Sequence, residues 1–363
     1  MGVFAGRLGI QQRVLPRYRT GFFDALATAC SGGLSLYAGM PRQDEAIQTA
    51  DGLQTASLVK GHNLHLLSGK AYLCWQPGLV RWLARWDPQA LVIEANPRYL
   101  STPAAVGWMH RRHRWVVGWG LGAPPQGNRF SALLRKTFLR QFDALITYSQ
   151  RGAAEYRRAG FPPEHVFVAP NAATRRPAFP LPIRQPGFDP RPAVLFVGRL
   201  QRRKRIDLLL RACASLPLER QPRLWIVGDG PARAELETLA QTVYPSAEFA
   251  GARYGADLEP FFIKADLFVL PGTGGLAVQQ AMSYGLPVMV AEADGTQADL
   301  VRPTNGWQIA PGSQEALTAV LMSALSDASR LRQMGADSYR IVAEEVNIEA
   351  MVSAFLAALQ VQI

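Results

Sequence analysis

The chain has 363 residues, of which 48% are hydrophobic and 18% charged, and its formal net charge is +11. This length and apolar content predict two packed globular domains and exclude a disordered chain. No apolar run approaches the roughly 18–20 residues of a membrane span, and we expect no secretory signal because the first residues lack a long apolar core. Three scattered cysteines favour a reducing cytoplasm over a disulfide framework.

Positive charge is concentrated in the first half of the chain. Residues 1–180 carry 22 Lys and Arg against 9 Asp and Glu, whereas residues 181–363 carry 17 against 19. A basic half is compatible with nucleic acid, an anionic membrane surface, an anionic substrate or a merely solvated surface. The basic residues are dispersed over helices and lack an interleaved aromatic platform, so we expect no nucleic-acid partner.

The first half alternates short apolar strands with helices. The expected helix over 77–86 carries Trp82 and Trp86 beside two arginines, a pattern that fits a core-packed helix and also one lying on a membrane. Ser101 is expected to cap a helix that has Pro103 in its first turn, and Ser149 another. The expected strands are 9–15, 34–38, 62–67, 90–94, 115–117, 144–147 and 166–169.

A proline-rich stretch over 177–192 interrupts this rhythm and predicts a semi-rigid linker at a domain boundary. We therefore expect one domain over 1–180 and a second over 181–344, with a last apolar helix over 345–363 packing back on the first. The second half then repeats the alternation. Its expected strands are 193–197, 224–227, 248–250, 267–270, 286–291 and 306–309.

This alternation in both halves predicts an α/β fold of two doubly wound, Rossmann-like parallel sheets that face each other across a cleft. Ligands of such sheets bind outside the carboxyl ends of the strands. The candidate loops are therefore 16–21, 94–99, 118–124, 198–205, 228–231, 251–255 and 271–276.

The stretch 270–287, LPGTGGLAVQQAMSYGLP, reads as a strand end, a glycine turn, a short helix and a new strand. Glycines let backbone N–H groups approach a ligand closely, and a helix start adds partial positive charge, which suits a phosphate or a polyhydroxyl. A glycine loop alone is weak evidence, and an ordinary βα connection is the alternative interpretation.

A second loop at a strand end, 198–205, carries Arg199 and Lys204. An arginine and a lysine opposite a glycine-lined helix start can hold a pyrophosphate leaving group without a metal. The alternative is a solvated basic loop. No Asp-x-Asp pair is present and the five histidines lack zinc-site spacing, so we expect no metal ligands. Asp229, between two glycines, can cap the helix that Pro231 begins or line a nucleotide pocket.

Several segments of the second half resemble the donor domain of the retaining glycosyltransferase family 4, which has the GT-B fold. The matching segments are FVGRLQRRKRIDLLL (196–210), LWIVGDGP (224–231), EFAG (248–251), KADLFVLPGTGGLAVQQAMSYGLPVMV (264–290) and DGTQADLVRPTNGW (294–307). In the first half, ITYSQRGAAEYRRAG (146–160) and VFVAPNA (166–172) resemble the end of the family's acceptor domain. The first 145 residues match only in general layout.

The resemblance implies a hexosyltransferase-type enzyme that moves a sugar from a UDP- or GDP-sugar with retention of configuration, without a metal or other cofactor. Arg199 and Lys204 would then hold the diphosphate and act in catalysis. The other donor-binding residues implied are Gly198, Asp229, Arg253, Tyr254, Thr273, Gly274, Gly275, Leu276, Ala277 and Gln280.

Two departures from the family pattern affect the expected site. The family usually has two glutamates eight residues apart in the loop and helix of 270–287, and this chain has Gly272 and Gln280 there. Gln280 can still hydrogen-bond ribose hydroxyls, but Gly272 has no side chain for the sugar. The family's first-domain histidine is also missing, and Trp119 stands near its position.

The first-domain loops are expected to bind the acceptor. A carboxylate such as Glu94 can orient an acceptor hydroxyl, or it can instead cap a neighbouring loop. The acceptor-side candidates, taken only from their places at strand ends, are Arg17, Tyr18, Glu94, Asn96, Arg98 and Trp119.

We therefore expect a cytoplasmic glycosyltransferase that acts on a glycan or lipid-linked acceptor in cell-surface polysaccharide synthesis, with its basic domain on the inner membrane face as a peripheral protein. The missing glutamates motivate an alternative, a GT-B-fold nucleotide-sugar epimerase or a catalytically inactive partner subunit. A dinucleotide oxidoreductase is not expected, since no Gly-x-Gly-x-x-Gly follows the first strand.

Overall fold

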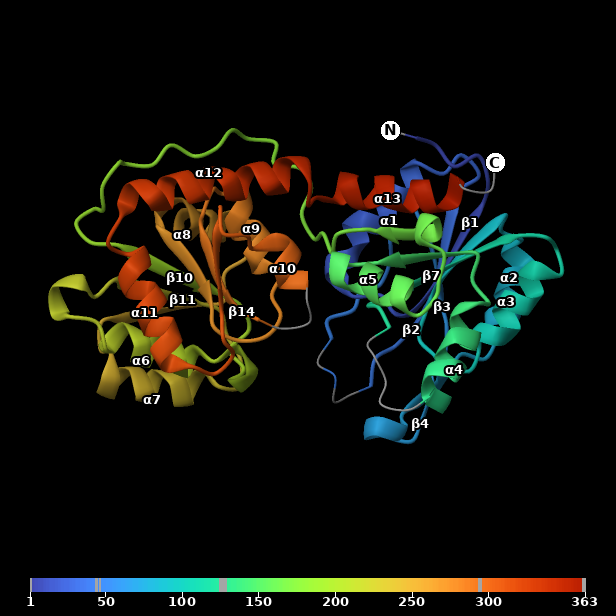
Figure 1. Cartoon of the computed structure of the whole chain (residues 1–363), viewed down its shortest axis with the longest axis horizontal. Coiled ribbons are helices and arrows are strands. Elements are labelled where there is room, and N and C mark those ends of the chain that lie inside the picture. Colours follow the sequence, from blue (N-terminus) through green and yellow to red (C-terminus); the bar gives the residue numbers. More distant parts are fainter. Residues whose placement is uncertain (1, 43–44, 46, 124–128, 293–295, 361–363) are drawn as a thin grey trace. The chain divides into compact units, whose positions relative to one another are not determined.

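A computed structural model describes residues 2–42, 45, 47–123, 129–292 and 296–360, and it divides the chain into two compact units. Unit 1 comprises residues 1–173 and 348–363, and unit 2 comprises residues 174–347. The expected boundaries, after residues 180 and 344, lie seven and three residues from these divisions. Each unit is a parallel sheet with helices on both faces (Figure 1).

Unit 1 has a seven-stranded parallel sheet in the order β3-β2-β1-β6-β7-β8-β9. The strand order reverses between β1 and β6, which is the switch point where doubly wound sheets bind ligands. The strands are β1 (Leu8–Val14), β2 (Leu34–Gly39), β3 (Ser57–Lys60), β6 (Ala90–Glu94), β7 (Trp115–Gly120), β8 (Ala144–Thr147) and β9 (Val166–Val168).

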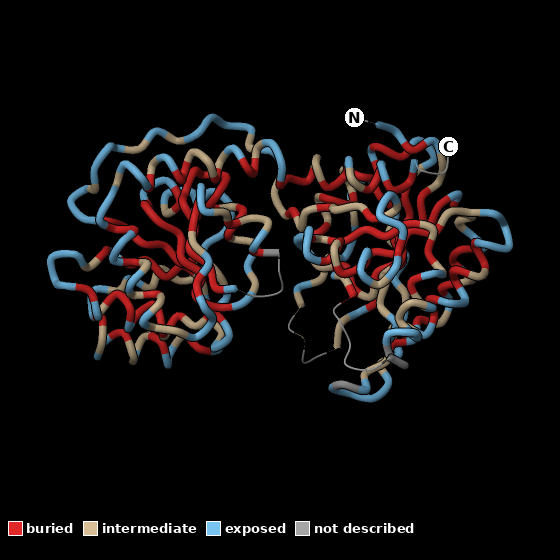
Figure 2. Tube along the Cα trace, viewed as in Figure 1, coloured by how far each residue is buried: buried red, intermediate tan, exposed pale blue. Residues whose placement is uncertain are grey.

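Helices cover the two faces of this sheet, and the apolar residues of its central strands β2, β1, β6, β7 and β8 are mostly buried (Figure 2). On one face α1 packs against α13, the terminal helix, whose Phe355 lies in the same core as Phe22 and Phe23. On the other face α2 packs against α3. The helices are α1 (Thr20–Thr28), α2 (Leu79–Trp86), α3 (Thr102–His110), α4 (Arg129–Leu139), α5 (Gln150–Arg158) and α13 (Ile348–Gln360).

Two local expectations for unit 1 need correction. The expected strand over 62–67 is present as Leu64–Leu66 (β4), but it pairs in antiparallel fashion with Leu73–Trp75 (β5) in a separate hairpin, and the strand beside β2 in the large sheet is Ser57–Lys60. Ser101 stands at the N-cap position of α3 but its hydroxyl bonds the backbone of Gln76 instead, accepting the N–H at 2.7 Å. Ser149 does cap α5, accepting the N–H of Gly152 at 3.0 Å.

Unit 2 has a six-stranded parallel sheet in the order β12-β11-β10-β13-β14-β15, with its switch point between β10 and β13. The strands are β10 (Ala193–Val197), β11 (Arg223–Val227), β12 (Ala247–Gly251), β13 (Leu267–Leu270), β14 (Val288–Ala291) and β15 (Gly306–Ile309). The helices are α6 (Ile206–Ala214), α7 (Arg233–Val243), α8 (Glu259–Lys264), α9 (Ala277–Ser283), α10 (Thr296–Leu300), α11 (Gln314–Ala324) and α12 (Ala328–Glu344).

The proline-rich segment belongs to unit 2 and is fixed to it by side chains of its own and of α12. Arg184 donates to the carbonyls of Phe262 and Tyr284 at 2.7 and 2.8 Å, and Tyr339 donates to the carbonyl of Phe179. Arg332 on α12 donates to the carbonyls of Gln185 and Gly187. In the described part of the chain, no helix combines the length and apolarity needed to cross a membrane.

Candidate donor and acceptor sites

Three loops follow the carboxyl ends of β10, β11 and β13, and they pack backbone against backbone. The N–H of Leu200 donates to the carbonyl of Asp229 at 2.9 Å, and the N–H of Thr273 donates to the carbonyl of Arg203 at 3.0 Å. These loops flank the switch point between β10 and β13. The topology and these hydrogen bonds therefore bring together the segments 198–205, 228–231 and 271–276 that the sequence analysis selected.

Glycines make this close packing possible. A Cβ atom on Gly228 would lie 1.9 Å from the carbonyl oxygen of Gly198, and one on Gly230 would lie 2.4 Å from that of Leu200. A Cβ on Gly272 would lie 2.2 Å from the carbonyl oxygen of Arg203. Since these neighbours are backbone atoms, a larger residue could enter only if a whole loop moved.

Lys204 connects two of the loops. It lies in a short 3-10 turn, Arg202–Lys204, is 6% exposed, and donates from Nζ to the carbonyls of Thr273, at 2.8 Å, and Gly274. Burial, with a smaller contribution from the neighbouring Arg203, lowers its pKa to about 8. An ammonium group has three donors, so one remains after both carbonyls are bonded.

The two other cations of this loop differ in how they are held. Arg203, which the sequence analysis did not select, donates from Nε to Gln201 at 2.9 Å, and its Nη1 lies 3.5 Å from the carbonyl oxygen of Thr273. Arg199 is exposed, and within the described residues its guanidinium has no hydrogen-bond or ion-pair partner. The structure therefore brings Lys204 and Arg203 to the glycine loop and leaves Arg199 free to bind a ligand.

The remaining donor-side residues lie on the same loops or on the helix that follows. Asp229 does not cap α7, whose N-cap is Ala232; its Oδ1 accepts the N–H of Gly230 at 2.7 Å. Tyr254 is 76% exposed, and Arg253 beside it is exposed. Three glycines have positive φ angles: +157° at Gly198, +68° at Gly274 and +154° at Gly275. The helix α9 has Leu276 as its N-cap and Ala277 as its first residue, and the half-buried Gln280 lies on it.

Glu94 is the last residue of β6, next to the switch point of unit 1. Its backbone N–H donates to Gln11 Oε1 at 3.1 Å, and its carboxylate accepts the backbone N–H of Arg13. Burial raises the pKa of Glu94 to about 7, although Arg13 and Arg19 oppose this shift. The carboxyl group therefore changes charge close to neutral pH.

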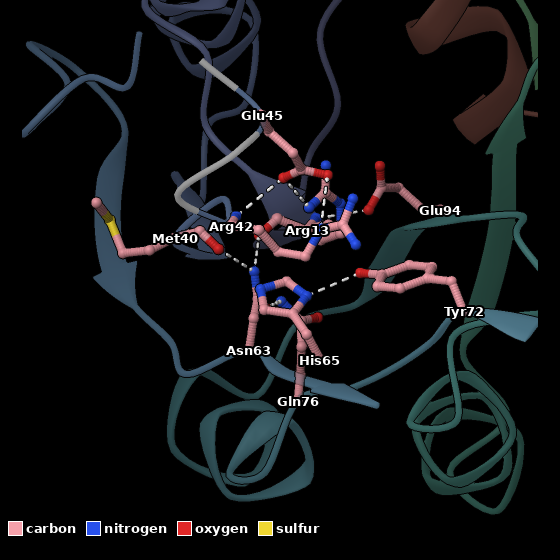
Figure 3. Close-up of polar contacts among 9 residues, drawn as sticks. All are labelled: Arg13, Met40, Arg42, Glu45, Asn63, His65, Tyr72, Gln76 and Glu94. Carbon is pink, nitrogen blue, oxygen red and sulfur yellow. Dashed lines mark hydrogen bonds and ion pairs between the residues drawn. The ribbon is translucent and has the colours of Figure 1, made fainter. Parts of the chain in front are cut away.

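Arg13, on β1, belongs to a polar network that the sequence analysis did not anticipate (Figure 3). Its guanidinium pairs with Glu45 at 2.7 Å, which raises the pKa of Arg13 and lowers that of Glu45 against the effect of burial. Asn63 Nδ2 donates to the carbonyl of Arg13 at 2.7 Å, and Gln76 Nε2 donates to Asn63 Oδ1 at 2.8 Å. The network fixes the residues just before β4 and just after β5, the two ends of the small hairpin, to the sheet edge that carries Glu94.

A signal for this network was present in the sequence. Gln11, Gln12 and Arg13 interrupt an otherwise apolar strand, and the two glutamines are 1% and 7% exposed. Buried polar side chains are usually hydrogen-bonded, so three in succession indicate partners from elsewhere in the fold.

One acceptor-side expectation is wrong. Trp119 is 2% exposed and lies in the core of unit 1, with its ring 4.9 Å from that of Phe355 on α13. Arg19, missed by the sequence analysis, is 4% exposed; it lies over the rings of Trp119 and Tyr148, and its Nη2 donates to Asn171 at 2.6 Å. Trp119 therefore supports the sheet edge from inside and presents no surface to an acceptor.

The other acceptor-side candidates lie on exposed or half-buried loops. Arg17 and Tyr18 follow β1 and are exposed, Tyr18 by 42%. Asn96 accepts the N–H of Arg98 at 3.1 Å, and Arg98 is exposed. Among the described residues no group of three or more His, Cys, Asp and Glu side chains could hold a metal ion.

Two family models match the chain. The model described as Glycosyl transferases group 1 matches residues 183–340, and the one described as Glycosyl transferase 4-like domain matches residues 10–172. A GDP-mannose-dependent alpha-mannosyltransferase of Mycobacterium tuberculosis is 42% identical over 118 residues, which are 32% of this chain and 29% of that protein. The sulfoquinovosyl transferase SQD2 of Arabidopsis thaliana is 35% identical over 148 residues, 39% of this chain and 28% of that protein.

Solved structures match over the whole chain at low sequence identity. The Anabaena HepE structure in complex with UDP has a TM-score of 0.68 at 16% identity, covering 98% of this chain and 99% of that one. The lipopolysaccharide outer core galactosyltransferase WaaB has a TM-score of 0.69 at 13% identity, with 98% and 100% coverage. These likenesses show the GT-B fold. With one family model on each unit, the chain belongs to the GT4-like group 1 glycosyltransferases.

Proposed function

We propose that the protein is a retaining, metal-independent hexosyltransferase that moves a sugar from a UDP- or GDP-sugar to a glycan or lipid-linked acceptor. The observation that carries the proposal is the buried Lys204 ammonium beneath the glycine loop at the unit 2 switch point. Family membership, a GDP-mannose-dependent relative and a structural neighbour that binds UDP support the choice of donor.

The departure of the nucleoside diphosphate from the sugar explains why cations are needed beside the glycine loop. When the bond from the sugar to the diphosphate breaks, negative charge grows on the leaving phosphate oxygen, and fixed positive groups lower the energy of that state. Lys204 keeps one donor for this oxygen, and the guanidinium of Arg199, which no described residue pairs with, can fork two phosphate oxygens. Together these cations would perform the charge-neutralising task that a divalent metal performs elsewhere.

Lys204→Met should raise the dissociation constant for UDP or GDP roughly 10- to 100-fold, the range expected for losing one charge-assisted hydrogen bond. Because the pKa of Lys204 is lowered to about 8, the cation is lost as the pH rises through 8. Wild-type affinity should therefore be full below pH 8 and fall above it, whereas the variant should not show this fall. Titration calorimetry from pH 6.5 to 9.5 measures both effects.

Arg211→Gln, which removes an exposed cation on α6 of the same unit, is the matched control and should leave affinity unchanged. A wild-type affinity that stays constant up to pH 9.5 would contradict the role of Lys204. A wild type that binds nucleotide but releases it from none of a panel of UDP- and GDP-sugars, with acceptor extracts present, would contradict transfer itself.

Gly272 stands where the family usually has a glutamate, and its environment explains why no side chain is present. The atoms nearest to a Cβ there would be Arg203 O and the Cα and carbonyl carbon of Lys204, all at 2.2–2.6 Å. We propose that the sugar is recognised without a carboxylate at this position, by the backbone of 273–277 and by Gln280.

Gly272→Glu should consequently fail to strengthen donor binding and should weaken it at least tenfold, because the side chain displaces the turn that carries Lys204. Gly272→Ala should show the same direction with a smaller effect. Gly187→Ala is the control, since a Cβ there meets no atom within 4 Å. Tighter donor binding by Gly272→Glu would show that the loop has room for the family glutamate.

Glu94 is our candidate for orienting the acceptor hydroxyl. Its carboxylate already accepts one backbone N–H from Arg13, and in the ionised form it can accept further hydrogen bonds. In a retaining reaction that uses the departing phosphate as base, Glu94 would act by holding the attacking oxygen in position.

Glu94→Gln should lower kcat about 10- to 100-fold and leave the dissociation constant for the nucleotide unchanged. Since its pKa is raised to about 7, the carboxylate form grows as the pH rises through 7. Wild-type kcat/KM should therefore increase from pH 6 to 8, and the variant should lack this increase. Asp51→Asn, a fully exposed carboxylate of unit 1, is the control; equal pH profiles for wild type and Glu94→Gln would refute the role.

We further propose a peripheral position at the cytoplasmic face of a membrane, where polysaccharide precursors carried by lipids are extended. Unit 1 holds the excess of basic residues, and α4 carries Leu133 and Leu134 with 61% and 56% exposure. The exposed Arg140 directly follows this helix. Exposed leucines beside cations suit an anionic lipid surface.

The protein should sediment with vesicles that contain anionic lipid, less so at high salt, and not with neutral vesicles. Leu133→Gln combined with Leu134→Gln should lower the bound fraction severalfold, because apolar side chains insert among the lipids. Leu218→Gln, at a leucine of unit 2 that is 81% exposed, serves as control. No sedimentation at either salt concentration would remove the membrane from the proposal.

A further inference from the structure

Unit 2 contains a cavity of about 690 Å³ at the amino ends of its strands. The first residues of β10 and β11, residues just before β13, and the proline-rich segment over 183–191 line it. The loops around Lys204 lie at the carboxyl ends of the same parallel strands. Strands of four or five residues, at about 3.3 Å each, separate the two edges by roughly 13–17 Å, so the cavity is distinct from the donor loops.

The side chains around this cavity carry more positive than negative charge. Arg184, Arg191, Arg223, Lys264 and Arg332 line it, against Asp189, Glu248 and Asp266. Arg223 is neutralised by Glu248 at 2.6 Å. The lining then keeps four cations (Arg184, Arg191, Lys264 and Arg332) against two carboxylates (Asp189 and Asp266), so its net charge is positive.

Arg332 is a largely buried cation of this cavity, with a side chain that is 19% exposed. It pairs at 2.7 Å with Asp266, whose side chain is 10% exposed. Its Nε and Nη2 also donate to carbonyls of the proline-rich segment. Its Nη1 is buried and finds no acceptor within the described part of the chain. A buried donor without a partner is costly, so the positive charge of Arg332, which lines the cavity, is only partly compensated by its neighbours.

Arg184 adds a second half-buried guanidinium, and none of the carboxylates in the described part of the chain contacts it directly. Its hydrogen bonds go to the carbonyls of Phe262, Ala265, Tyr284 and Gly285. Burial, and after it the charge of Arg332, lowers the pKa of Arg184 to about 10. Two guanidiniums therefore share the single carboxylate of Asp266, whose second oxygen is taken by the N–H of Ala193 at 2.8 Å.

Two further cations, Arg191 and Lys264, line the cavity. Arg191 and Lys264 are exposed, and neither has a hydrogen-bond or ion-pair partner among the described residues. Their donors are therefore available to an anion, and Arg332, which lines the same cavity, adds a third positive charge. Guanidinium and ammonium groups are the side chains that bind phosphate oxygens.

We propose that this cavity binds a phosphorylated small molecule, with Arg191 and Lys264 holding the phosphate and Arg332 adding positive charge nearby. A cavity of this size has room for more than a phosphate ion, since ligand pockets of roughly 300–1,000 Å³ hold whole metabolites. The ligand would also contact the proline-rich segment, because residues within 183–191 line the cavity directly. The site is thus a second ligand site of the donor-side unit, separate from the sugar-donor loops.

Titration calorimetry on the full chain tests the site, with glucose 6-phosphate and inorganic phosphate as probes. The measurements use Lys204→Met as the parent, so that binding at the donor loops is suppressed, with potassium chloride at equal ionic strength as reference. Both probes should compete for one saturable site. Tighter binding of glucose 6-phosphate would identify a phosphorylated molecule as the ligand class, and equal binding would leave free phosphate as the occupant and overturn that class.

Arg191→Gln combined with Lys264→Gln should raise the dissociation constant at least tenfold, since each removes a charge-assisted hydrogen bond. These exposed residues can be changed without disturbing the Arg332–Asp266 pair. Arg211→Gln in the same parent should change nothing. A dissociation constant within twofold of the parent for the double variant would overturn the site, and so would the absence of saturable binding. UDP affinity is measured separately on protein that retains Lys204. Because that measurement reports on the donor loops alone, failure of the cavity proposal can be distinguished from failure of the proposed transferase function.

Discussion

The candidate donor site of unit 2 depends on one contact, that between the Lys204 ammonium and the carbonyls of Thr273 and Gly274. A lysine is buried only where its donors find acceptors, and here the acceptors are the backbone of the glycine loop itself. The loop can offer them because Gly274 and Gly275 adopt positive φ angles that other residues rarely adopt. The charge and the shape of the site therefore share one cause.

In each unit, burial shifts the pKa of one ionisable side chain toward neutrality, and the two shifts have opposite signs. In unit 2 burial lowers the pKa of a lysine to about 8, and in unit 1 burial raises the pKa of a glutamate to about 7. Each residue lies next to the switch point of its sheet, and each is held by backbone groups: carbonyls for Lys204 and the Arg13 N–H for Glu94. Both charges consequently respond to pH near neutrality, which surface residues of these types do not do.

Much of the fold could be predicted from sequence because its signals are local. Apolar runs such as Leu267–Leu270, ended by proline and glycine, predict strands and turns without knowledge of the partners. The edge strand Ser57–Lys60 was missed because it is short and mostly exposed, so it lacks the apolar run of its neighbours. The burial of Trp119 was missed because Phe355, from a helix more than 230 residues away, covers it.

The loops of the candidate sites could be predicted from sequence because glycines and basic residues are typical of ligand-binding loops, whereas the contacts between these loops could not. Gly272 could be recognised as a departure from the family, but the Arg203–Lys204 backbone that excludes a side chain there is a tertiary contact. The link between Arg13 and Glu94 joins residues 81 positions apart, and no local pattern encodes such a pairing.

The cavity at the amino ends of the unit 2 strands is formed mainly by the proline-rich segment, and less by the sheet itself. A doubly wound sheet concentrates loops for ligands at its carboxyl edge, and its amino edge is ordinarily closed by short connections. Here the long segment between the units lies along that edge, held by Arg184 and Arg332, and the cavity forms between the segment and the strand starts. The two arginines that fix the segment bring more positive charge than Asp266 neutralises. An anion at this place would compensate the excess, and it would do so without altering any residue of the donor loops.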